Sequence, residues 1–87
     1  MAEYAVELKP PARKELDRLP LNVVERVFSK LESLAENPRP SGCKKLKGGS
    51  NEWRIRVGDY RVVYFIDDAK QFVGVTRIRQ RSEVYED

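Results

Sequence analysis

Hydrophobic and polar positions alternate with a period of two in three stretches of the second half of the chain, residues 53–57, 60–66 and 72–79. Such alternation is typical of half-buried β-strands, whose successive side chains point to opposite faces of a sheet. Gly58-Asp59 separates the first two stretches, and glycine at the first central position of a two-residue loop favours a type II′ turn. The pattern therefore predicts a hairpin followed by a third antiparallel strand.

The first half of the chain begins with another alternating stretch, residues 2–8, which predicts a short strand. Pro10-Pro11 ends this strand and suits the first turn of a helix, where a missing N–H costs nothing. Apolar residues then recur at helical spacing from Ala12 to Leu19, just before Pro20. We expect a short helix here.

A second, longer helix is predicted from Asn22, whose side chain can cap the first turn, to the Asn-Pro-Arg-Pro sequence at 37–40. Its apolar stripe is Val24, Val27, Phe28, Leu31, Leu34 and Ala35. Two helices joined by so few residues should form an antiparallel hairpin that covers the apolar face of the sheet. The predicted fold class is α+β: an N-terminal strand, the helix hairpin, and a three- to four-stranded antiparallel sheet with both helices on one face.

The length of 87 residues predicts a single domain, 1–87, with a thin core and marginal stability unless a partner binds. The chain has no histidine and one cysteine, Cys43, so we expect no metal site, no disulfide and no cofactor. Neither a leader peptide nor an apolar run long enough to cross a bilayer is evident, which predicts a cytoplasmic protein.

Positive charge is concentrated in the middle of the chain. The formal net charge of +3 divides into −1 for residues 1–38, +5 for 39–66 and −1 for 67–87. Lysines lie beside glycines in the loop 41–50, at Lys44, Lys45 and Lys47, where a phosphate backbone can approach closely. A lysine-rich loop can also serve only solubility.

Arginines occupy all three predicted strands. Arg54, Arg56 and Arg61 alternate with apolar residues in the hairpin, and Arg77 and Arg79 end the last strand. One alternative is that they form the solvated face of an antiparallel sheet. The other is a continuous basic surface that binds phosphate, which three consecutive cationic strands favour.

Three segments together resemble RelE-type toxins of the RelE/ParE superfamily. They are WRIRVGDYRVVY at 53–64, KLKG at 45–48 and RQRSEVY at 79–85. The similarity covers nearly the whole chain and implies a RelE-like fold of the microbial ribonuclease type. It also implies a toxin of a type II toxin–antitoxin pair. In the RelE branch such toxins cut mRNA in the ribosomal A site, and in the ParE branch they poison DNA gyrase.

The resemblance also implies which residues carry the chemistry. The family's functional positions fall on Arg54, Arg56, Arg61, Arg79 and Tyr85. The cations expected to assist RNA or ribosome binding are Lys44, Lys45, Lys47, Arg77 and Arg81. Two of the family's positions are lysines in its best-known member and arginines here, at 54 and 56. Because arginine stays protonated, neither can act as the general base, and Glu83 is the only acid near these positions in the sequence.

Three functions are compatible with these residues. The first is a ribosome-dependent mRNA endonuclease that uses the 2′-hydroxyl as nucleophile and inhibits translation. The others are a gyrase inhibitor of the ParE kind and a non-enzymatic basic RNA-binding module. The expected partners are an acidic RelB-like antitoxin, the ribosome and mRNA.

Overall fold

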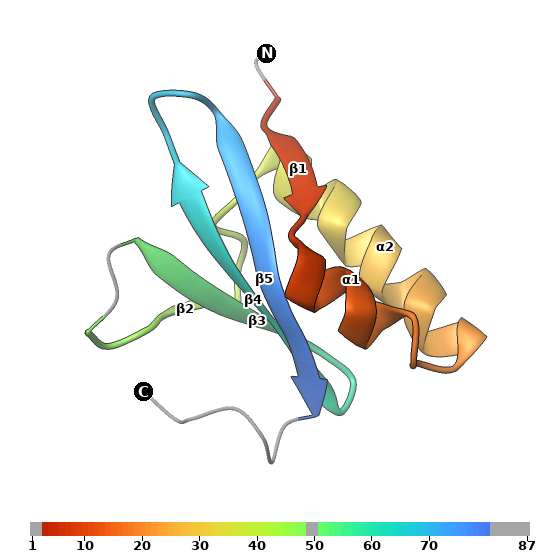
Figure 1. Cartoon of the computed structure of the whole chain (residues 1–87). Coiled ribbons are helices and arrows are strands. Elements are labelled where there is room, and N and C mark those ends of the chain that lie inside the picture. The colour runs from red at the N-terminus through yellow and green to blue at the C-terminus, as the bar shows by residue number, and fades with distance from the viewer. Residues whose placement is uncertain (1–2, 49–50, 81–87) are drawn as a thin grey trace.

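The computed structural model describes residues 3–48 and 51–80, in which two helices pack on one face of a five-stranded sheet (Figure 1). The elements are β1 (Ala5–Leu8), α1 (Pro10–Leu16), α2 (Leu21–Glu36), β2 (Lys44–Lys45), β3 (Glu52–Val57), β4 (Tyr60–Asp67) and β5 (Phe72–Gln80). The strand order is β1-β5-β4-β3-β2, with β2 to β5 antiparallel. The predicted α+β class is confirmed. No helix of the described residues is long and apolar enough to cross a membrane.

The N-terminal strand β1 joins the sheet as a fifth strand and runs parallel to β5. Its register places Ala5 opposite Phe72 and Leu8 opposite Val75. Beyond this point β1 gives way to α1, while β5 continues to Gln80. The edge of β5 therefore has a strand beside it along its first half only.

Proline lies at the start of both helices, and only the cap of α2 differs from the prediction. α1 begins as expected, with Pro10 and Pro11 in its first turn, and ends at Leu16. The proposal that Asn22 caps α2 is wrong, because the N-cap is Pro20 and Asn22 already lies inside the helix. The extended backbone of Pro20 directs its carbonyl to the amides of Val23 and Val24, so the helix starts without a side-chain cap.

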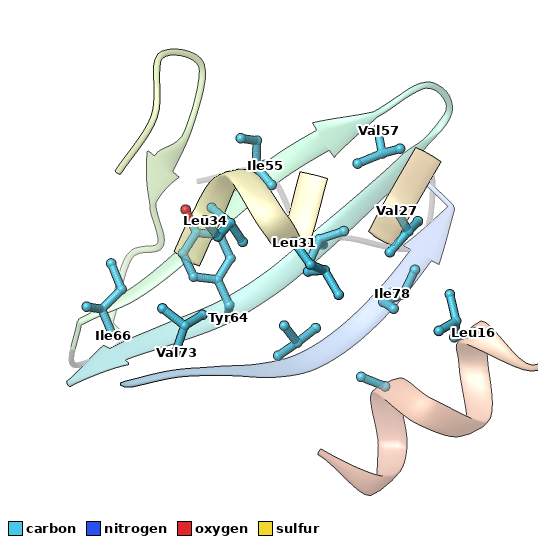
Figure 2. Packing of buried hydrophobic residues seen from close by; sticks show 13 residues of the cluster. Leu16, Val27, Leu31, Leu34, Ile55, Val57, Tyr64, Ile66, Val73 and Ile78 are labelled. Atoms are coloured by element: carbon cyan, nitrogen blue, oxygen red, sulfur yellow. The ribbon is translucent and has the colours of Figure 1, made fainter. Parts of the chain in front are cut away.

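The core lies between the helices and the sheet (Figure 2). Its buried residues are Ala12, Leu16, Val27, Leu31, Leu34, Ile55, Val57, Val62, Tyr64, Ile66, Val73, Val75 and Ile78. Phe28, which was predicted to belong to the α2 stripe, is 46% exposed because it falls at the margin of the buried face. Tyr64 is fully buried and donates a hydrogen bond of 2.8 Å to the carbonyl of Pro38. Burial raises the pKa of the Tyr64 hydroxyl, which stays protonated.

The β3–β4 hairpin has the faces and the turn that its sequence predicts. Trp53 pairs with Tyr64, Ile55 with Val62 and Val57 with Tyr60, all on the helix-facing side. Gly58 has a φ of 59°, whereas Asp59 has no positive φ, as a type II′ turn requires.

β5 departs from simple alternation. A strict period of two would place Val73, Val75, Arg77 and Arg79 on one face. The register with β4 shifts between Val63 and Tyr64, which pair with Arg77 and Val75, so Thr76 is an extra residue in a β-bulge. The Thr76 hydroxyl donates a hydrogen bond to the Val63 carbonyl. The bulge sends the two valines into the core and the two arginines to the opposite face.

Candidate nucleic-acid interface

The face of the sheet opposite the helices, here called the outer face, carries cations in two rows across the strands. In the first row, Arg61 of β4 lies directly between Arg56 of β3 and Arg79 of β5. Because neighbouring strands lie about 4.8 Å apart, these three arginines occupy a short stretch of surface. We call Arg56, Arg61 and Arg79 the arginine row. The register of β3, β4 and β5 thus places Arg61 at the centre of this row.

The second row lies beside the first on the outer face, two residues further along each hairpin strand from the turn. It consists of Lys44, Arg54, Val63 and Arg77, on β2, β3, β4 and β5 respectively. Ten site residues, nine cations and one tyrosine, were predicted from the sequence. The outer face brings together six of them, all cations.

Two of these arginines are nearly inaccessible to solvent. Arg54 is 7% exposed and Arg61 is 4% exposed, whereas Arg56 and Arg77 are exposed and Arg79 is half-buried. Removing a guanidinium from water is costly, so a face that served only for solvation would not bury two of them. A partly desolvated cation also interacts more strongly with an anion than one in bulk water. This burial favours an anion-binding surface.

The structure adds an acidic residue that the sequence analysis missed. Glu15 of α1 accepts hydrogen bonds of 2.8 Å from the Arg79 Nε and 3.2 Å from the Arg77 Nη1. It also accepts a 2.8 Å bond from the backbone N–H of Ile78, on the edge of β5 that β1 does not cover. Glu15 thus replaces a neighbouring strand and holds both arginines of β5. The contact joins residues 62 to 64 positions apart, and no local pattern distinguishes Glu15 from other acids.

The environment of Glu15 keeps it ionised. Partial burial acts to raise the pKa of Glu15, but the hydrogen bonds from Arg79 and the Ile78 backbone, with the charges of Arg79 and Arg77, hold that pKa below its ordinary value. A carboxylate stabilised in this way is a poor proton acceptor. Its role at this site is to orient arginine side chains.

The remaining predicted residues lie outside the two rows. Lys45 pairs with Trp53, so its side chain starts on the helix-facing side, and Lys47 is exposed beyond β2. Both border the cationic surface. Arg81 and Tyr85 lie outside the described residues, as does Glu83.

Aromatic side chains occupy the other end of the outer face. Phe65 pairs with Gly74, and a Cβ at position 74 would lie only 2.3 Å from the Phe65 ring. The ring therefore covers the glycine, and it contacts Phe72 with centroids 5.9 Å apart. This pair gives the outer face an apolar, aromatic end next to its cationic rows, a combination used for single-stranded nucleic acids.

Arg39, although it belongs to the basic middle of the sequence, has a structural role. Its guanidinium donates two hydrogen bonds, of 3.2 and 2.8 Å, to the carboxylate of Asp68 and lies 5.2 Å from the Trp53 ring centroid. Tyr4 donates a further bond of 2.7 Å to Asp68. This cluster ties the segment after α2 to the sheet.

The chain is similar to known proteins over nearly its whole length. Residues 6–85 match the family described as ParE toxin of type II toxin-antitoxin system, parDE. The mRNA interferase toxin RelE of Escherichia coli K12 is 35% identical over 94% of this chain and 90% of its own length, and toxin RelE of Mycobacterium tuberculosis is 36% identical over 94% and 86%. The archaeal RelE–RelB complex from Pyrococcus horikoshii contains a chain with a TM-score of 0.82, 26% identity and coverage of 93% and 98%.

Proposed function

This chain belongs to the RelE/ParE family of toxins from type II toxin–antitoxin systems, and we propose that it is an endonuclease that cuts mRNA in the ribosomal A site. The E. coli relative, at 35% identity, is named an mRNA interferase toxin. The observation that supports the proposal most directly is the arginine row, in which the buried Arg61 lies between Arg56 and Arg79. Such a row matches the negatively charged phosphate at which the reaction takes place.

The reaction is an attack of a ribose 2′-oxygen on the adjacent phosphorus. The new P–O bond forms as the bond to the 5′-oxygen breaks, so the 2′-hydroxyl loses a proton and the departing oxygen gains one. Negative charge on the phosphoryl oxygens increases in the transition state. Forked guanidinium donors suit these oxygens, and preorganised donors in a partly dry site stabilise that charge without further reorganisation. We assign this role to Arg61 and Arg79, with Arg54 and Arg56 beside them.

The candidate site offers few groups that can exchange a proton at neutral pH. For this reason we propose that cleavage depends on the ribosome. The sequence contains no histidine, and arginine cannot exchange protons at neutral pH. Placing the 2′-hydroxyl in line with the scissile bond can supply about 7 to 11 kcal/mol, and the ribosome would provide that alignment. Tyr85 would stack on an unpaired base or exchange a proton. Naked RNA should be cut poorly or not at all.

The proposed partner is an acidic, RelB-like antitoxin. A solved archaeal relative forms a complex with RelB. The exposed cations of the outer face attract an acidic segment, and covering them would block access of mRNA to the arginine row. Binding of the antitoxin should therefore weaken as the salt concentration rises.

The decisive experiment adds purified protein to programmed ribosomes, maps the mRNA ends and measures single-turnover cleavage. Replacing Arg61 or Arg79 by Ala should slow cleavage about 10- to 1000-fold, equivalent to roughly 1.4 to 4 kcal/mol of transition-state stabilisation. Lys70→Ala, in the exposed β4–β5 loop, is the matched control and should retain the wild-type rate. Tyr85→Phe should lose less activity than Tyr85→Ala if stacking dominates.

Two outcomes would contradict this proposal. Wild-type cleavage by both Arg61→Ala and Arg79→Ala would remove the arginine row from the mechanism. Because the matching family model is described as a ParE toxin, gyrase supercoiling should be assayed in parallel. Inhibition of supercoiling without any cut mRNA would assign the chain to the gyrase-directed branch.

A further inference from the structure

A second cationic surface lies on α2, away from the centre of the outer face. A hollow of about 310 Å³ separates α2 from the end of the β3–β4 hairpin. Four of its lining residues are Arg26, Ser29, Lys30 and Ser33, whose spacing of three and four residues places them on one face of the helix. Arg56 and Gly58 line the hairpin side. The sheet end that carries this hairpin turn lies under α2, as the neighbouring core residues Val27 and Val57 show (Figure 2).

The cations of this hollow differ from others of the molecule in their electrostatic environment. Arg39 is paired with Asp68, and Arg77 and Arg79 share Glu15. Within residues 3–48 and 51–80, no ion pair or side-chain hydrogen bond involves Arg26, Lys30 or Arg56. Three positively charged residues thus line one hollow whose lining contains no carboxylate, and none of the three forms an ion pair with a described carboxylate. An anion bound there would offset their mutual repulsion.

One of these cations, Arg26, lies close to the backbone of Gly58. The φ of 59° at Gly58 serves the turn, and a Cβ at this position would lie 3.1 Å from the Arg26 Nη1 and 3.2 Å from its Nη2. The guanidinium therefore lies against the turn, and a Cβ at position 58 would displace it by a few tenths of an ångström. This contact places the donors of Arg26 at the border of the hollow.

We propose that this hollow binds a backbone phosphate of RNA, as a second contact on the same strand whose cleavage we assign to the arginine row. The inference rests on the proposed function. Two guanidinium groups, an ammonium group and serine hydroxyls supply the donors that phosphate oxygens accept. Arg56 belongs to both the hollow and the arginine row, so the two sites are continuous.

The topology of the sheet leaves a path between the two sites. β2 pairs with β3 at Trp53 and Arg54, and among the described residues no strand lies beside the edge of β3 from Ile55 to Val57. A phosphate backbone that contacts the outer face can therefore turn around this open edge at Arg56 and reach α2. An acidic protein segment is the alternative occupant, and the test separates the two.

The test measures binding of a fluorescein-labelled oligouridylate of about 12 nucleotides to the whole chain over a range of salt concentrations. The variant R26A/K30A should bind about tenfold more weakly, and the slope of log affinity against log salt should fall by about 0.7, the value for one lost phosphate contact on a single strand. The control K14A/K70A removes the same charge from exposed residues outside the hollow. It should change affinity less than twofold.

Two further arms keep the result specific. Circular dichroism should show unchanged folding of R26A/K30A. R26Q/K30Q, which retains polar side chains without the charge, should show the same loss of binding. Single-turnover cleavage on ribosomes should be unchanged in the control K14A/K70A. A wild-type chain that never cleaves would contradict the proposed function while leaving the binding result intact. Equal oligouridylate affinity for R26A/K30A and K14A/K70A would overturn the proposal. Binding of polyglutamate, an acidic polypeptide, is measured in the same way. If R26A/K30A lost binding to polyglutamate but kept full affinity for oligouridylate, the proposal would be overturned and the hollow would be assigned to an acidic protein.

Discussion

The two halves of β5 differ in residue type and in role: residues 72–75 are apolar or glycine, whereas residues 77–80 are mostly charged or polar. Residues 72–75 have a strand on each side, β1 and β4, and direct Val73 and Val75 into the core. Residues 77–80 have β4 on one side and, on the other, the carboxylate of Glu15 in place of a strand. Their arginines point to the outer face. The difference shows that the candidate site lies where the sheet is less complete.

The point of change is the bulge at Thr76. Without it, burying the valines would also bury the arginines, because a period of two assigns all four to one face. With it, a single strand supplies the core and the cationic surface in succession. Substitutions in the two halves of β5 should therefore affect stability and cleavage differently. The predictions below are ordered from the largest expected effect to the smallest.

Deleting Thr76 should abolish cooperative folding. The deletion forces either Arg77 and Arg79 into the core or the valines out of it, and burying an unpaired charge costs several kcal/mol per group. The loss should exceed about 5 kcal/mol, comparable to the whole stability of a small domain. Thermal unfolding followed by circular dichroism measures it. Thr76→Ala, which keeps the bulge and loses one hydrogen bond, is the control and should cost about 1 kcal/mol. A deletion variant that melts like Thr76→Ala would show that the bulge is dispensable.

Val75→Ala should lower stability without altering the site. Val75 is fully buried, so truncating it should cost about 2 kcal/mol and lower the melting temperature by about 10 °C. Arg79→Ala should show the reverse pattern, with a large loss of cleavage and a smaller change in stability. Denaturant unfolding and single-turnover cleavage, measured on both variants, give the comparison. Equal loss of activity per folded molecule in Val75→Ala would mean that the two halves are not separable.

Glu15→Gln should affect the arginine half alone. The amide keeps an acceptor for the Ile78 N–H but loses the charge that holds Arg79 and Arg77. We expect a stability loss of about 1 kcal/mol and a fall in cleavage rate of about three- to tenfold, because Arg79 is less well oriented. Glu25→Gln, on the exposed side of α2, is the matched control. A wild-type cleavage rate in Glu15→Gln would limit Glu15 to a structural role.

Acid should remove the contribution of Glu15 to stability. Its pKa is lowered in the folded protein, so near the ordinary glutamate value of 4.5 the unfolded chain binds more protons than the folded one. The stabilisation is therefore complete at neutral pH and is lost as the pH falls below about 4.5. Unfolding free energies of the wild type and Glu15→Gln should differ by about 1 kcal/mol at pH 6 and converge near pH 3. Asp68, whose pKa is also lowered, affects both proteins equally. A constant difference across this range would contradict the assignment.

Much of the fold can be predicted from the sequence because its signals are local. The alternation of Trp53, Ile55 and Val57 and the glycine of the turn determine the faces of the hairpin from residues close in the chain. The same local reasoning failed at β5, where the bulge depends on which side chains the core can accept. The available signal was the spacing of Val75 and Ile78. These apolar residues are three positions apart, whereas residues on one face of a regular strand are two or four apart, so the spacing indicates an inserted residue between them.

The candidate site was predictable in part. The arginines of β3 and β4 follow from alternation, whereas their burial depends on the packing of the whole face. Glu15 could not be identified, because its partners Arg77 and Arg79 are more than 60 residues away and no local pattern distinguishes it from other acids of the chain. The roles of Tyr85 and Arg81 remain predictions from the family resemblance.

The parallel pairing of β1 with β5 joins the first strand of the chain to the last. During synthesis, Ala5 leaves the ribosome long before its partner Phe72, and Glu15 long before Arg79. Neither the sheet edge nor the arginine row can be completed until almost the whole polypeptide has emerged, and such long-range pairing is slow to form. Under the proposed function, a nascent chain therefore stays inactive until its synthesis is nearly finished, and an antitoxin has until the end of translation to meet it.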